Sequence, residues 1–555
     1  MKTFFLHIYL HFYYQVLGDI NITILHINDL HSRFDEFDDN GNFYGGVARI
    51  AYKANELKKA AKDPKSVLFL NAGESFSGTV WFALHRWKIV SEFLNLLPID
   101  AMSVGLHEFD DTIKNLTKFV ESSKFPLLSC NTKYPTSALN SKVKSWVTFT
   151  VDSIQIGVIG VTLKLAEKHA SAGGSVFYNE IDSIRRHANN LEDKGVQIII
   201  ALTNVGYEHD LKIADYLDNI DIIIGGTTNT FLYTGDPPDS EKPADTYPKI
   251  VRKSSGKKVL ILQAYAYGKY LGVLNLKVSN KGEIIDYSGN PILLSSDIQK
   301  DEEVEKLIQQ YKKEIESVTN TIIGEAINEL SRQKCRSEEC NLGNLLTDSF
   351  IDYVRDYYPA NSYWSNCAIA FVNSGSIKKV IPSGKVSIGH VYESVPYCEP
   401  LVLIDVTWQV LLGALEVGFG GVVDDKHGQF LQVAGLIVKV DKTRRSGSRI
   451  IDVQARCQKC ISPKYEPLGL ESSYKVVTNR YLAYGGDGQD ELKSFKRNEK
   501  MFDLNDNQAI ITYFRKYNSV DVDVEGRIIF VNCGIKMIFN RFIINLTLLL
   551  SSLFY

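Results

Sequence analysis

The chain has 555 residues and a mass of 62.5 kDa, more than one hydrophobic core normally organises, so we expect two or three domains. Hydrophobic residues make up 45% and charged residues 23% of the chain, which excludes a disordered or collagen-like protein. The formal net charge of −3 and the mean hydropathy of −0.10 argue against a nucleic-acid-binding protein and a polytopic membrane protein.

The first 18 residues have the features of an export signal. Lys2 is followed by a short apolar and aromatic stretch, and Val16 and Gly18 fit the small-residue pattern before a cleavage site. We therefore predict a secretory signal peptide at 1–18 with Asp19 as the new N-terminus. The alternative is a first buried strand or helix. Export would make the protein secreted and extracellular, and it would place the cysteines in an oxidising compartment.

The first half of the chain alternates apolar runs with amphipathic stretches. Helical patterns at 47–62 and 180–195 lie between the apolar runs, and this alternation indicates a layered α/β fold. Polar residues follow several of the runs, and we expect these residues to meet in one cleft at the carboxyl ends of the strands. The predicted buried strands are 22–27, 66–73, 100–105, 154–162, 196–203 and 220–226.

A charged, helix-forming stretch at 297–318 separates the two halves, and we interpret it as an interdomain helix. Beyond 323 the pattern is mixed, with short strands at 368–373, 401–406 and 431–440 and glycine-rich turns. The predicted division is a signal peptide at 1–18, a first domain at 19–296, an interdomain helix at 297–322, a second domain at 323–534 and a hydrophobic tail at 535–555.

The last residues, 542–555, are apolar but too short to span a bilayer comfortably. They follow small or polar residues at Asn532, Cys533 and Gly534, an order that resembles a glycolipid-anchor signal. Two interpretations stay open: a GPI anchor at the cell surface, or a hydrophobic extension without an anchor. We expect contact with a membrane only in the first case.

Four of the eight cysteines lie in two short motifs, CRSEEC (335–340) and CQKC (457–460). Two such knuckles could form a zinc ribbon. The long stretch between them and the predicted export favour two local disulfides instead. An N-glycosylation sequon at Asn115 fits the same compartment.

Ten short stretches carry a resemblance to a known family. In chain order they are NDLH, NAGES, GLHEFDD, ALTNVGYE, IIGGTTNTFLYTG, ECNLGNLLTD, NSGSIK, GQFLQVAG, YKVVTN and YGGDG. This order resembles the 5′-nucleotidase/apyrase family from about 22 to 530. The resemblance implies an α/β fold in which a four-layer metallophosphoesterase β-sandwich flanked by helices is joined, through an interdomain helix, to a C-terminal α+β nucleotide-binding domain.

The same resemblance implies hydrolysis of extracellular nucleotides at a two-metal centre, and it extends to salivary proteins of blood-feeding arthropods that act against platelet aggregation. CRSEEC and CQKC match family disulfide positions, which implies the pairs Cys335–Cys340 and Cys457–Cys460. Cys367 and Cys398 could also pair.

The metal ligands of the family map onto this sequence with four replacements. The bridging Asp is replaced by Glu74, and Leu106 replaces an Asn with a side chain that has no donor atom. Neutral amide and hydroxyl oxygens also bind more weakly than the two imidazoles they replace. We therefore expect one weakly bound divalent ion (Zn, Mn, Mg or Ca) or none. Site one would be Asp29, His31, Glu74 and Asn229, and site two Glu74, Leu106, Asn204 and Thr227.

His107 and Asp110 match the catalytic His–Asp pair of the family. In that role the imidazole would stabilise a phosphoryl oxygen in the transition state and the carboxylate would orient the imidazole. The alternative is that both residues persist as hydrogen-bond partners that structure the loop, which the expected loss of the second ion favours.

A nucleotide-binding set is better preserved. Lys378 stands where the family has Arg, so it keeps the charge but not the bidentate fork. We expect the second base-stacking aromatic, after GGDG, to be replaced by Gln489. Its loss would cost about 1–3 kcal/mol of stacking by analogy with other base–aromatic contacts. The expected nucleotide contacts are Arg336, Asn373, Lys378, Tyr397 and Asp487.

Three functions are consistent with these residues. The first is a secreted, catalytically impaired family member that binds ADP, ATP or AMP, or a host platelet or cell-surface protein, and so blocks signalling. The second is an active nucleotidase or apyrase with one ion or with rearranged ligands. The third is a receptor-blocking protein with an empty cleft.

Overall fold

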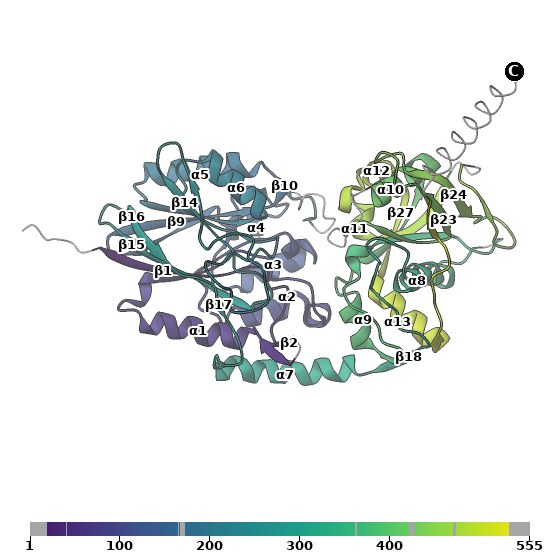
Figure 1. The fold of residues 1–555 in the computed structure, drawn as a ribbon, viewed down its shortest axis with the longest axis horizontal. Helices are drawn as coiled ribbons and strands as arrows, with labels where there is room; N and C mark the ends of the chain where they lie inside the picture. Colours follow the sequence, from purple (N-terminus) through teal and green to yellow (C-terminus); the bar gives the residue numbers. More distant parts are fainter. Residues whose placement is uncertain are drawn as a thin grey trace, which may run out of the picture.

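The computed structural model describes residues 19–39, 41–164, 166, 172–360, 363–420, 428–469 and 473–531. The predicted signal peptide, the hydrophobic tail and Cys533 lie outside these residues. The described chain forms two lobes connected by α7 (Glu302–Thr319), which runs below both lobes in Figure 1. None of the helices in the described ranges has the length and apolar character needed to cross a membrane.

The first lobe is a sandwich of two β-sheets. One sheet has the strand order β16-β15-β1-β4-β5-β6 with β17 paired to β15, and the other has the order β13-β14-β12-β11-β9-β8. The strands of the first sheet are β1 (Ile20–Ile27), β4 (Val67–Asn71), β5 (Ala101–Ser103), β6 (Leu127–Leu128), β15 (Tyr270–Val278), β16 (Ile284–Ser288) and β17 (Ile292–Leu293). Those of the second sheet are β8 (Trp146–Val151), β9 (Ile154–Thr162), β11 (Ile198–Asn204), β12 (Ile222–Ile224), β13 (Lys249–Arg252) and β14 (Lys258–Leu262).

Apolar side chains from the facing sides of the two sheets, such as Ile24 and Leu70 from one and Ile200 and Ile224 from the other, form the inner core. Helices cover both outer faces, which confirms the predicted four-layer sandwich. The helices are α1 (Val47–Ala60), α2 (Val80–Leu94), α3 (Ile113–Ser122) and α4 (Ser137–Lys142) on the side of the first sheet, and α5 (Glu180–Asp193) and α6 (Tyr207–Tyr216) on the other. Two short ribbons pair β2 (Phe37–Asp39) with β3 (Asn42–Tyr44) and β7 (Thr132–Lys133) with β10 (Val176–Phe177).

Parallel pairing brings the functional loops to one edge of the sandwich. β1, β4 and β5 are parallel neighbours in the first sheet, and β9, β11, β12 and β14 are parallel neighbours in the second. Such strands are buried on both faces of the sheet, so their sequences are nearly continuous runs of apolar residues. The six predicted strands are all present, and the polar loops after β1, β4, β5, β11 and β12 contact one another, as expected.

Helix α7 has a clear start signal. The Asp301 carboxylate accepts hydrogen bonds from two N–H groups of the first turn, and the acidic residues in that turn suit the positive end of a helix. Val304 and Ile308 pack into the core of the first lobe. The predicted helix at 297–318 is therefore present, but it begins at Glu302 because the residues before it form the cap.

The second lobe contains a five-stranded sheet (β22-β19-β26-β21-β27), a four-stranded sheet (β25-β24-β23-β29) and a three-stranded sheet (β20-β18-β28). Its strands are β18 (Ile322–Ala326), β19 (Ile369–Asn373), β20 (Gly384–Ser387), β21 (Pro400–Val406), β22 (Leu431–Ala434), β23 (Leu436–Val440), β24 (Ile450–Arg456), β25 (Tyr465–Pro467), β26 (Tyr474–Asn479), β27 (Arg497–Asn505), β28 (Ser519–Val520) and β29 (Ile528–Phe530). Its helices are α8 (Asn341–Tyr357), α9 (Ile388–Ser394), α10 (Trp408–Gly420), α11 (Arg480–Ala483), α12 (Asp490–Phe495) and α13 (Asp506–Tyr517).

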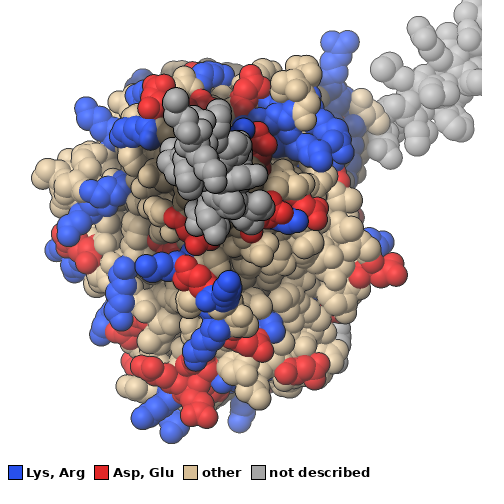
Figure 2. Space-filling view, turned by 90° about the vertical axis from the view of Figure 1, so that its left-hand side faces the viewer, with Lys and Arg blue, Asp and Glu red and all other residues tan. Residues whose placement is uncertain are grey.

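Both predicted disulfides are present in this lobe, Cys335–Cys340 and Cys457–Cys460. Cys367 and Cys398 are buried free thiols, so the further pairing considered from the sequence is not formed. On the face of the first lobe that Figure 2 shows, positive and negative side chains are intermixed, in agreement with the small net charge.

Candidate functional site between the two lobes

The loops after β1 and β4 are held together by backbone hydrogen bonds. The N–H of Asp29 donates to the carbonyl of Gly73 (3.1 Å), and that of His31 donates to the carbonyl of Glu74 (2.9 Å). Glu108, which sequence reasoning overlooked, completes this frame. Its buried carboxylate accepts from the N–H groups of four residues: Glu74, Ser75, Phe76 and Gly105. The sequence signal for it was its place between His107 and Asp110.

The backbone is strained at five of the expected ligand positions. The φ angles are 53° at Asp29, 49° at His31, 62° at Glu74, 82° at Thr227 and 51° at Asn229. Positive φ is a genuine outlier for a β-branched residue such as threonine, and such strain persists only where the surroundings impose it, commonly at functional sites. The loops therefore keep the shape of a functional site although several side chains in them are replaced.

The expected second metal site is filled by hydrogen bonds between its own residues. The Leu106 N–H donates to Glu74 Oε1 (3.1 Å) and to Asn204 Oδ1 (3.0 Å). The Thr227 hydroxyl lies 2.7 Å from the same Glu74 oxygen and 2.5 Å from the same Asn204 oxygen. The oxygens that would face a second ion are thus already paired with protein donors, so these residues do not fit that ion.

Both carboxylate oxygens of Asp29 also accept hydrogen bonds. Its carboxylate accepts from the N–H groups of Thr227 (2.7 Å) and Asn229 (3.0 Å) and from the side-chain amide of Asn28 (3.0 Å). Burial, and then the neighbouring charge of Glu74, raise the pKa of Asp29 to about 7, against the effect of these three bonds.

His107 lies between the metal-site loops and the second lobe. Its Nδ1 is 2.6 Å from Asp110 Oδ2, and its Nε2 is 3.5 Å from Glu74 Oε2. Burial lowers its pKa, but the carboxylates of Asp110 and Glu74 outweigh burial and raise the pKa of His107 well above the usual value. The ring of His31 is 5.2 Å from that of His107, and burial lowers the pKa of His31. Nitrogen and oxygen atoms of His31, Glu74 and His107 lie within 4.8 Å of one another.

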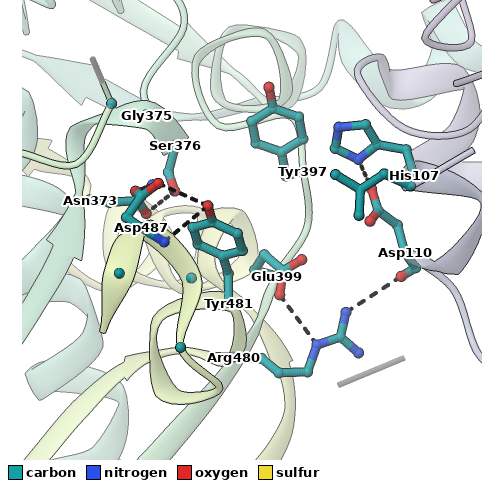
Figure 3. A pocket seen from close by; sticks show the side chains of 15 residues that line it. His107, Asp110, Asn373, Gly375, Ser376, Tyr397, Glu399, Arg480, Tyr481 and Asp487 are labelled. Carbon is teal, nitrogen blue, oxygen red and sulfur yellow. Dashed lines mark hydrogen bonds and ion pairs between the residues drawn. The ribbon is translucent and has the colours of Figure 1, made fainter. Parts of the chain in front are cut away.

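A cavity of about 390 Å³ lies between the lobes beside His107, as Figure 3 shows. This volume is in the usual range for small-molecule sites. The first lobe contributes Leu106, His107 and Asp110 to the lining, and the second contributes Asn373, Gly375, Ser376, Tyr397, Glu399, Gly428, Arg480, Tyr481, Gly485, Gly486, Asp487 and Gly488.

Asp487 and Asn373 form a prearranged polar wall of this cavity. The side-chain amide of Asn373 donates to Asp487 Oδ2 (2.9 Å), and the Tyr481 hydroxyl donates to Asp487 Oδ1 (2.8 Å). Ser376 in turn donates to Asn373 Oδ1 (2.8 Å). Asp487 has a φ of 52° between glycines, which holds its carboxylate toward Asn373 and Tyr481.

Gln489, which we expect at the position of the second aromatic, does not reach the cavity. Gln489 is buried, its amide donates to the Ala414 carbonyl (3.1 Å), and it is not part of the lining. Tyr481 also lines the cavity, so two rings of the second lobe, those of Tyr397 and Tyr481, lie beside it in Figure 3. The signal was a tyrosine six residues before Asp487, in α11 rather than after GGDG.

Lys378 and Arg336 are not among the lining residues, although the charge of Lys378 acts on His31 and that of Arg336 acts on Tyr397. The Lys378 ammonium is 5.0 Å from the centre of the Tyr397 ring. Burial, and then the charge of Arg336, lower the pKa of Lys378 to about 8. Sequence reasoning also missed Arg480, which bonds Glu399 (3.3 Å) in its own lobe and the Asp110 carbonyl (3.5 Å) in the other.

Comparisons with known proteins agree with this architecture. A family model described as calcineurin-like phosphoesterase matches residues 22–229, and one described as 5′-nucleotidase, C-terminal domain, matches residues 317–494. The first of these folds implies use of a divalent metal. A 5′-nucleotidase precursor from Thermus thermophilus has a related structure with a TM-score of 0.76 and 31% identity, covering 92% of this chain and 99% of that chain.

Full-length relatives extend the match. An apyrase from Tabanus yao is 34% identical over 92% of this chain and 94% of its own length. A snake venom 5′-nucleotidase from Crotalus adamanteus is 36% identical over 92% and 89%, and the 5′-nucleotidase of Homo sapiens is 34% identical over 92% and 91%. Because these matches span both lobes at such identities, the chain belongs to the 5′-nucleotidase/apyrase family, whose members act on nucleotides.

Proposed function

We propose that the protein binds an extracellular nucleotide (ADP, ATP or AMP) in the cavity between its lobes and hydrolyses it slowly or not at all. The observation that carries this proposal is the hydrogen-bonded group of Glu74, Leu106, Asn204 and Thr227 at the expected second metal site. Removal of one group that stabilises transition-state charge commonly costs about 10²–10³ in rate, and the loss of an ion should cost at least as much.

The nucleotide side of the cavity supports binding. Tyr397 and Tyr481 offer aromatic faces to a base, and such stacking contributes about 1–3 kcal/mol per base by alanine substitution. The carboxylate of Asp487 can accept hydrogen bonds from ribose hydroxyls, and Lys378 supplies positive charge near the Tyr397 ring. His107 occupies the end of the cavity toward the first lobe, where a phosphate would lie.

The extracellular setting rests on the predicted signal peptide and is supported by the two disulfides and by a relative named as a venom protein. Nucleotide sequestration outside cells would lower the free ADP available to platelets and so oppose aggregation. A direct contact with a platelet or cell-surface protein is the other route that the sequence leaves open.

The test is a calorimetric titration with ADP, together with phosphate release measured in Mg²⁺, Ca²⁺, Mn²⁺ and Zn²⁺. The Tabanus yao apyrase serves as the matched active control for phosphate release from ADP, and the snake venom 5′-nucleotidase as the control for release from AMP. We expect one ADP bound per chain and phosphate release about 10²–10³ below the control or lower. Turnover near that of the control would contradict the proposal, as would the absence of ADP binding.

One observation favours an active enzyme as the second candidate: the His107–Asp110 pair keeps a 2.6 Å hydrogen bond at the edge of the cavity. Such a pair can orient an imidazole toward a phosphoryl oxygen. This candidate predicts metal-dependent turnover that His31→Ala and His107→Ala both abolish. Turnover that survives both substitutions would exclude it.

A further inference from the structure

We propose that this chain holds a single transition-metal ion with His31, Glu74 and His107, so that His107 is a metal ligand instead of a free acid or base. The inference deepens the proposed function, because this ion would lie beside the nucleotide cavity, but its test requires no nucleotide. Compared with the first metal site expected from the sequence, this set of ligands includes His107 and leaves out Asp29.

The spacing of the three side chains fits one ion. Their ligand atoms lie within 4.8 Å of one another, and Nε2 of His107 is 3.5 Å from Oε2 of Glu74. Bonds of about 2.0–2.1 Å in a tetrahedral zinc site place neighbouring ligand atoms about 3.3–3.4 Å apart. An ion can therefore lie between these two atoms with only a small adjustment.

The orientation of His107 also calls for a cation at this point. Its Nδ1 is 2.6 Å from the Asp110 carboxylate, so Nδ1 is engaged with Asp110 and Nε2 is the ring nitrogen that faces Glu74. A cation between Nε2 and Oε2, either a second ring proton or a metal ion that displaces it, makes this contact attractive. A carboxylate behind a ligating histidine is the usual support of such a ligand.

The competing ligand positions are occupied. Both oxygens of Asp29 accept N–H donors. Oε1 of Glu74 accepts from the Leu106 N–H and the Thr227 hydroxyl, whereas Oε2 accepts one longer bond from the His107 N–H (3.3 Å) and faces Nε2 of His107. The Oδ1 atom of Asn229 is buried and has no hydrogen-bond partner among the described residues. It is therefore available as a fourth, weaker ligand.

The chemistry of the ligand atoms favours particular metal ions. Two imidazoles with one carboxylate suit Zn²⁺ or Co²⁺, whereas Mg²⁺ and Ca²⁺ prefer sets made only of oxygen. His107 also lines the nucleotide cavity, so an ion held by His107 would lie beside that cavity.

The experiment uses the full chain after treatment with a chelator. Zn²⁺ affinity is measured by competition with a chromophoric chelator, and the visible absorption of bound Co²⁺ reports the coordination number. We expect one ion per chain. His107→Ala should weaken Zn²⁺ binding at least about a hundredfold and change the Co²⁺ spectrum, and Asp110→Asn should weaken it about 10–100-fold.

Two further variants make the test decisive. His209→Ala, on α6 and away from the cavity, should leave Zn²⁺ binding unchanged, which controls for surface histidines. Asp29→Asn should weaken binding far less than His107→Ala does. Thermal unfolding in chelator identifies any variant that fails to fold, and His107→Gln then replaces His107→Ala. Loss of metal with Asp29→Asn but not with His107→Ala or His107→Gln would overturn the proposal, as would two ions per chain.

Discussion

The two walls of the cavity between the lobes differ in how their polar groups are used. On the first lobe, the oxygens of Glu74 and Asn204 at the expected second metal site are paired with donors from Leu106 and Thr227. On the second lobe, Asn373 and Tyr481 hold the Asp487 carboxylate at the edge of an open cavity. In the proposed function, the second lobe recognises the nucleotide and the first lobe limits its hydrolysis.

The largest expected effect comes from restoring the family ligands on the first lobe. A chain with Glu74→Asp, Leu106→Asn, Asn204→His and Thr227→His should release phosphate from ADP about 10²–10³ times faster than the natural chain, because the second ion could then bind. Phosphate release with Zn²⁺ or Mn²⁺ and the number of bound ions are measured together. Binding of two ions without faster release would show that the defect lies elsewhere.

On the second lobe, two substitutions of Tyr481 distinguish the contribution of its ring to ADP binding from that of its hydroxyl. Tyr481→Ala should weaken ADP binding by about 1–3 kcal/mol through loss of stacking, whereas Tyr481→Phe should retain most of the affinity. Tyr484→Ala, three residues further on and outside the lining, is the matched control. Calorimetric titration measures all three variants, and an equal loss in Tyr484→Ala would disprove the stacking role.

The charge of Lys378 predicts a pH dependence for binding. Burial lowers its pKa to about 8, so the ammonium is mostly charged at pH 7 and mostly neutral at pH 9. If the charged form binds phosphate, ADP affinity should fall about tenfold over that interval, since one pKa unit corresponds to a tenfold change in the protonated fraction. Lys378→Arg stays charged and should make the affinity independent of pH in this range. The same decline in Lys378→Arg would show that another group titrates.

The smallest expected effect concerns the contact between the walls. Arg480 reaches the Asp110 carbonyl across the cavity over 3.5 Å, and a typical hydrogen bond contributes about 0.5–1.5 kcal/mol. Arg480→Gln should therefore shift the population toward separated lobes by about two- to tenfold. Small-angle scattering should detect a larger radius of gyration. An unchanged profile would show that other contacts between the lobes, such as those of α2 and α7 with α9, are sufficient to fix them.

The sequence predicted the first lobe more completely than the second. Its parallel strands are mostly apolar, as in the IIIALTN segment of β11. Polar residues lie at or after the end of each strand, so the strands and the convergence of their loops could be inferred. The position of α7 could have been refined from Asp301, which is a typical N-cap residue before an acidic turn.

The details of the site depend on contacts that no linear pattern contains. The hydrogen bond from the Thr227 hydroxyl to Glu74 requires a positive φ at Thr227 and a specific rotamer of its side chain. The hydrogen bond from Arg480 to the Asp110 carbonyl requires the observed arrangement of the two lobes. The ring beside Asp487 was missed because it can come from a helix earlier in the chain as well as from the residue that follows the glycines. Tyr481 in α11 is that ring.

The central claim is that the cavity binds a nucleotide but cannot assemble two metal ions. A crystal structure of the protein grown with ADP and Zn²⁺ tests it most directly. We predict intact ADP between Tyr397 and Tyr481 with at most one ion in the metal-site loops. Two well-occupied ions bridged by Glu74, with AMP and phosphate in place of ADP, would contradict it.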